Sequence, residues 1–105
     1  MFTTAKDREE LQYLLEDILG STNVYFQPPA SVRMKYPAIV YSLENINDLP
    51  ANNDPYHRDK SYQLTLIDKD PDSEIVDKLS DLQFCSFERF FTSDNLNHFV
   101  YRIFY

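Results

Sequence analysis

The chain has 105 residues, and its 17 acidic against 10 Lys and Arg residues give a net charge of −7. This length predicts one domain spanning 1–105, and a hydrophobic content of 43% excludes an intrinsically disordered chain. The acidic balance argues against sequence-specific binding of nucleic acid, which needs basic groups that neutralise phosphates.

The first expected element is an amphipathic helix. Apolar residues recur there at spacings of three and four, which places them on one stripe. They are Leu11, Leu14, Leu15, Ile18 and Leu19. Thr3 or Thr4 can cap the start of this helix, and Gly20 suits the left-handed position after its end.

Three strands are expected next. Residues 24–26 form a short apolar run with two aromatic residues and precede Pro28 and Pro29, which is typical of an edge strand. The apolar run 38–43 predicts an inner strand buried on both faces. Residues 61–67 alternate between apolar and polar, so Tyr62, Leu64 and Leu66 should share the core face.

Residues 44–59 separate the second and third of these strands. They are polar, contain four Asn and two Pro between 45 and 55, and show neither a helical nor a strand period. Connections this long are usually functional or disordered. We expect a long hairpin loop at 44–59, at the tip of the two strands.

The second half of the chain predicts a helix followed by two strands. Asp70 and Pro71 have the pattern of a capping acid followed by proline at the first helical position. Residues 84–91 and 99–105 then predict two strands, giving the order α-β-β-β-α-β-β. The fold class is therefore α+β, a mostly antiparallel sheet of four to five strands with two helices packed on it.

Charge is unevenly distributed along the chain. Residues 1–20 carry −3, 44–59 carry −3 and 68–83 carry −4, whereas 21–43 contain Arg33 and Lys35 and no acid. A bipolar surface suits head-to-tail contact between copies, although a solvated acidic face would explain the acids as well.

No motif predicts a catalytic, cofactor or metal site. The acids at 68, 70 and 72 have the spacing of a calcium loop, but Ser73 replaces the required glycine and Leu79 the final glutamate, so helix capping explains them better. A single glycine in the chain excludes glycine-rich phosphate loops. We expect no cofactor.

Cysteine and histidine are too sparse for a recognisable zinc or thiol site. His57, Cys85 and His98 lack the short spacing of zinc ligands, and Cys85 begins an apolar strand, where it would act as a small hydrophobe. One cysteine makes no internal disulfide, and no basic and apolar leader or membrane-spanning run occurs. We therefore expect folding in the cytoplasm, without a membrane.

Aromatic residues crowd 84–105, and about half should face the core. Because Phe90 and Phe91, like Phe104 and Tyr105, are neighbours that point to opposite faces of a strand, another subunit is expected to cover part of this surface. The exposed aromatic residues, the basic segment and the long loop together form the predicted subunit and partner interface. Its residues are Arg33, Lys35, Asp48, Leu49, Asn53, Tyr56, Arg58, Phe90, Phe91, Phe104 and Tyr105.

Several segments resemble the small tail-terminator and tail-completion proteins of long-tailed bacteriophages. They are Gly20-Ser21-Thr22-Asn23-Val24-Tyr25-Phe26-Gln27-Pro28-Pro29, Met34-Lys35-Tyr36-Pro37-Ala38-Ile39-Val40-Tyr41, Tyr62-Gln63-Leu64-Thr65-Leu66-Ile67-Asp68-Lys69-Asp70-Pro71-Asp72-Ser73 and Asn95-Leu96-Asn97-His98-Phe99-Val100-Tyr101. The resemblance implies a virion structural protein. It would form a six-fold homo-oligomeric ring that caps the tail tube, ends its growth, docks to the head-completion proteins and lets DNA pass.

Three alternatives predict different behaviour. A head-side connector or stopper would bind on the capsid side. A small acidic DNA mimic, which regulates a host enzyme, would be a monomer or dimer with carboxylates spaced like phosphates. A hydrolase would need Cys85 exposed beside His57 or His98.

Overall fold

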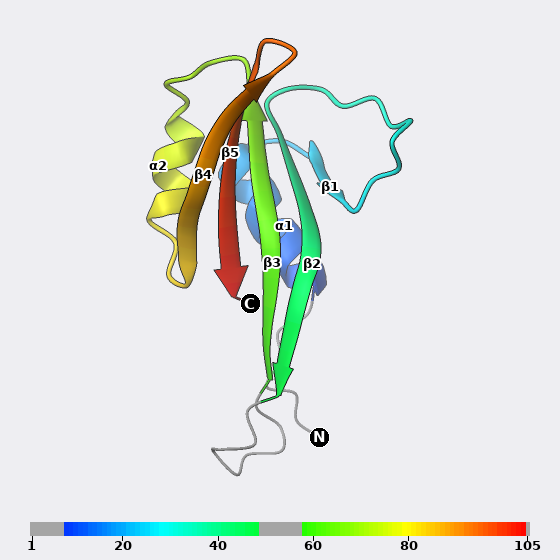
Figure 1. Cartoon of the computed structure of the whole chain (residues 1–105), viewed down its shortest axis with the longest axis vertical. Helices are drawn as coiled ribbons and strands as arrows, with labels where there is room; N and C mark the ends of the chain where they lie inside the picture. The colour runs from blue at the N-terminus through cyan, green and yellow to red at the C-terminus, as the bar shows by residue number, and fades with distance from the viewer. Residues whose placement is uncertain (1–7, 49–57, 105) are drawn as a thin grey trace.

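The computed structural model of the chain describes residues 8–48 and 58–104, with the backbone alone for 46–48 and 58–59. Its elements, in chain order, are α1 (Arg8–Leu19), β1 (Val24–Phe26), β2 (Ala38–Asp48), β3 (Arg58–Asp68), α2 (Glu74–Ser80), β4 (Cys85–Ser93) and β5 (Leu96–Phe104) (Figure 1). This order confirms the predicted α+β fold.

The five strands form one sheet in the order β1-β2-β3-β5-β4. Only the β1–β2 pair is parallel; the other three pairs are antiparallel. The two helices pack on the same face of this sheet (Figure 1). We call it the helix face, which contains Tyr62, Leu64 and Leu66 of β3, and we call the opposite face, with Ser61, Gln63 and Thr65, the open face.

The core lies between α1 and the central strands because the period of each element directs its apolar residues there. Leu11, Leu15 and Leu19 of α1 are buried, and they pack with the alternate residues of β2, β3 and β5. Gly20 ends the helix with φ +80°, and its N–H donates to the carbonyl of Glu16 at 2.8 Å. Both features agree with the sequence prediction.

Strand boundaries differ from the prediction on either side of the long loop. β2 continues to Asp48 and β3 begins at Arg58, and the two strands pair as far as these residues. The predicted loop at 44–59 was therefore too long, because the hairpin ladder extends through polar residues that have no apolar period. The prediction that the second strand is buried on both faces was wrong at the end of the run, since Leu43 is exposed, whereas Ala38, Ile39 and Tyr41 are buried.

The start of the second helix also differs from the prediction. Ser73 is the N-cap of α2, and its hydroxyl accepts from the N–H of Ile75 at 3.3 Å. The carboxylates of Asp68 and Asp70 accept instead from the backbone two residues on, at 3.0 and 2.9 Å. Aspartate competes for nearby N–H groups in this way, so these acids build turns before the helix.

Candidate interaction surfaces

The two edges of the sheet are unlike. β1 has three residues, whereas β4 has nine and only its first residue is not exposed. An edge strand leaves one row of backbone N–H and C=O groups without a strand partner. The long edge is therefore β4.

The β1 edge is blocked by its own surroundings. The Val24 carbonyl accepts from the side-chain amide of Gln12 on α1 at 3.0 Å, and the Val24 N–H donates to the Thr22 carbonyl at 2.8 Å. Gln12 is held in turn by the hydroxyl of Tyr41, which donates to its amide oxygen at 2.6 Å. Pro28 and Pro29, which follow β1, have no N–H to offer.

Aromatic side chains cover β4 on both faces. Phe87 and Phe90 lie on the helix face, where their rings meet Tyr101 and Phe99 of β5 at centroid distances of 5.4 and 5.0 Å. They remain 53% and 47% exposed, because α2 leaves this part of the strand uncovered. On the open face Phe91 stacks on His98 at 4.5 Å.

A β-bulge interrupts β4 at Glu88 and Arg89. The register with β5 shifts between Phe87 and Arg89, so two residues of β4 oppose a single position of β5. As a result, both charged side chains lie on the open face: Arg89 pairs with Val100, and Glu88 reaches Arg102 at 3.4 Å. Bulges commonly redirect side chains in this way.

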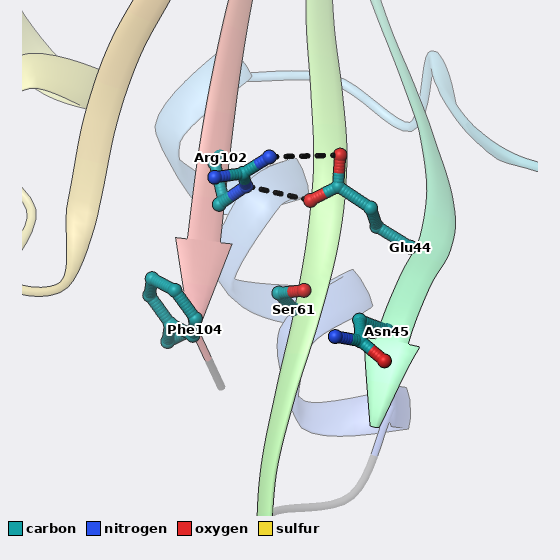
Figure 2. Close-up of a pocket in the computed structure, with 5 residues that line it drawn as sticks. All are labelled: Glu44, Asn45, Ser61, Arg102 and Phe104. Atoms are coloured by element: carbon teal, nitrogen blue, oxygen red, sulfur yellow. Dashed lines mark hydrogen bonds and ion pairs between the residues drawn. The ribbon is translucent and has the colours of Figure 1, made fainter. Parts of the chain in front are cut away.

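A second bulge, in β2, directs Glu44 onto the same arginine. The register with β3 shifts between Leu43 and Asn45. The carboxylate of Glu44 then crosses over β3 and accepts from Nε and a terminal nitrogen of Arg102 at 2.6 and 3.2 Å (Figure 2). The hydrogen bond from Arg102 lowers the pKa of Glu44, and the same pair raises the pKa of Arg102.

These side chains line a shallow pocket on the open face, with a volume of about 340 Å³. Its lining residues are Glu44, Asn45, Ser61, Arg102 and Phe104 (Figure 2). Arg102 is engaged by Glu44 and Glu88, so its positive charge is balanced within the chain. The ion pairs of Arg102 thus link β5 to β2 and β4 across the open face, beside the pocket.

The flanks beside the two edges carry opposite charge. Exposed Arg33 and Lys35 lie in the segment 27–37, which extends beside β1 and β2 (Figure 1). The segment 70–81, which includes α2, lies at the β4 side of the sheet (Figure 1), and five of its residues are exposed acids. They are Asp70, Asp72, Glu74, Asp77 and Asp81.

Other predicted interface residues divide into two groups. Phe90, Phe91 and Phe104 are exposed, and Asp48 pairs with Arg58 at the far end of the β2–β3 hairpin. Leu49, Asn53, Tyr56 and Tyr105 lie outside the described residues. Sequence reasoning missed Glu44, Phe87, Glu88, Arg89 and Arg102, because the bulges that direct them depend on pairing between distant strands.

Cys85 and His98 do not meet. Cys85 packs against the core on the helix face, and burial raises the pKa of its thiol to about 11. His98 lies on the open face, opposite Phe91. His57 is outside the described residues, within which no cluster of His, Cys, Asp or Glu could hold a metal ion.

No known protein family and no curated protein matches this chain. Across the described parts of the chain, no helix is long and apolar enough to cross a membrane.

Proposed function

We propose that this protein is a structural subunit of a long-tailed bacteriophage, which forms a ring at the head-to-tail junction and ends the growth of the tail tube. One observation carries the proposal. The basic flank with Arg33 and Lys35 and the acidic flank of α2 lie at opposite edges of the same sheet. Two unlike, complementary surfaces on opposite sides of a subunit are what a closed head-to-tail ring requires.

The β2–β3 hairpin supports the same proposal. Its paired end at Asp48 and Arg58 projects beyond the rest of the sheet (Figure 1). Such an arm can contact the tube or a neighbouring subunit of the ring. The two faces of the ring would then bind the tail tube and the head-completion protein, and DNA would pass through its centre without sequence-specific contacts.

The test is reconstitution with the tail tube protein. We expect the chain to form rings once the tube protein is added, as measured by light scattering, and to shorten tubes viewed by electron microscopy. Reversing the basic flank in R33E/K35E, or the acidic flank in E74K/D77K, should each prevent ring formation because like charges then meet. Combining all four changes should restore it.

The matched control is D17K, which changes an exposed acid on α1 that belongs to neither flank. It should form rings like the unchanged protein. A chain that neither self-associates nor alters tube length would contradict the proposal. Binding to a head-side protein without any effect on tubes would instead indicate a connector or stopper.

A further inference from the structure

We propose that β4 is a self-complementary edge, through which two copies of this chain pair as an antiparallel, two-fold dimer. This inference goes beyond the ring, whose contacts join unlike surfaces. The dimer would join identical ones, and it would exist in the isolated protein without any phage partner.

The pairing follows from the order of residues in β4. Around its centre the strand reads Phe87-Glu88-Arg89-Phe90. When this segment lies antiparallel to itself, with Glu88 opposite the Arg89 of the second copy, Phe87 falls opposite Phe90 on each side of the two-fold axis. Opposite charges and aromatic pairs are both favourable cross-strand partners.

The bulge makes this register consistent with the two faces of the sheet. Opposed residues in an antiparallel pair must lie on the same face. Glu88 and Arg89 both lie on the open face, and Phe87 and Phe90 both lie on the helix face. Without the bulge, neighbouring residues would point to opposite faces and neither pair could form.

Side chains of β4 that are unpaired or half exposed in the single chain match the proposed partner. Among the described residues Arg89 has no ion pair of its own, since the ion pairs on this face join Arg102 to Glu44 and Glu88. Phe87 and Phe90 are half exposed while resting on β5. Pairing would give Arg89 a carboxylate and would cover both rings, whereas the blocked β1 edge offers no comparable row.

The dimer and the ring would exclude each other. α2 packs beside β4, so a second copy on β4 occupies the flank that carries the acidic surface. A subunit held as a dimer must therefore separate before it joins a ring.

Charge exchange tests the register. The unchanged protein should show a monomer–dimer equilibrium by sedimentation and light scattering across a range of concentrations. R89E sets a carboxylate opposite Glu88 at both charge pairs of the dimer, so its dissociation constant should rise about tenfold or more. E88R/R89E exchanges the charges, keeps the net charge and restores the pairs across the axis. It also removes the ion pair between Glu88 and Arg102, but Arg102 keeps its shorter contact with Glu44, so the dissociation constant should still return to within about threefold of the original.

Cysteine cross-linking tests the same register independently. In a C85S background, S86C/F91C brings two cysteines opposite each other in the proposed pairing and should form disulfide dimers on oxidation. The control S86C/S93C shifts the register by two residues on the same face and should cross-link far less. Circular dichroism checks that each variant is folded.

Either of two results would overturn the proposal. One is a protein that stays monomeric at every concentration. The other is a dimer whose dissociation constant is unchanged by R89E, or is not recovered by E88R/R89E. Because neither charge variant alters Arg33, Lys35 or α2, loss of the dimer with intact rings would separate this inference from the proposed ring.

Discussion

Removing the side chain of Gln12 should destabilise the protein through three hydrogen bonds at once. Its amide oxygen accepts from the hydroxyl of Tyr41 at 2.6 Å, and its amide nitrogen donates to the Val24 carbonyl and to the Glu16 carboxylate, each at 3.0 Å. Tyr41 is 1% exposed, so in Q12A its hydroxyl loses an acceptor inside the core. A buried donor without an acceptor costs about 1–3 kcal/mol, and although Arg8 still bonds to the oxygen of this hydroxyl, we expect Q12A to lose about 2 kcal/mol of unfolding free energy.

Y41F removes the hydroxyl together with its need for an acceptor. It should cost only about 1 kcal/mol, because the partly exposed Gln12 can then bond to water. Q12A/Y41F should be less destabilised than the sum of the single variants, with a coupling of about 1 kcal/mol.

Urea unfolding followed by circular dichroism measures all three variants. A loss of about 2 kcal/mol should also lower the melting temperature by about 8–16 °C in a domain of this size. Strict additivity of Q12A and Y41F would refute the reasoning, because it would mean that the two side chains stabilise the fold independently.

Three further predictions concern single residues. Gly20→Ala should cost about 1 kcal/mol in urea unfolding, because φ is +80° while no atom lies within 4 Å of the added Cβ; an unchanged midpoint would contradict this. Glu44 has a lowered pKa, so its stabilising effect is present above its ordinary value of 4.5 and is lost as pH falls through the lowered one. E44Q should therefore be less stable than the unchanged protein at neutral pH, and the difference should vanish in acid; a constant difference in urea midpoint would count against the ion pair. Cys85, with its pKa raised from 9.0 to about 11, should react with iodoacetamide at pH 8 about 100-fold more slowly than the unfolded chain, and equal rates would show an exposed thiol.

Local patterns predicted the elements that depend on local period. The stripe of α1, the alternation of β3 and the glycine after α1 each follow from the spacing of a few residues, and the α+β order followed from them. The charge difference between 21–43 and 68–83 could also be predicted, because the charge of a segment follows from its sequence without knowledge of the fold.

Features set by pairing between distant strands could not be predicted in this way. The sequence prediction placed Glu44 in a loop because the residues around it are polar and show no strand period. In the structure these residues continue β2 because β3 lies beside them and pairs with them. Asp94 and Asn95, both with positive φ, form a short turn, so β4 continues to Ser93 and β5 begins at Leu96. The predicted strands ended at 91 and began again at 99. The assignment of β4 to the edge required the sheet order itself.

The groups that block the backbone edge of β1, Gln12 among them, limit how many neighbouring strands this sheet can add. A sheet with two open edges can add copies without end, which is the route to fibrils. Here the β1 edge is short and is blocked by the Gln12 amide, the Thr22 carbonyl and two prolines, so strand addition at β4 uses the one available edge and stops at two copies. These few groups thus separate a chain that assembles to a finite size from one that could grow into a filament.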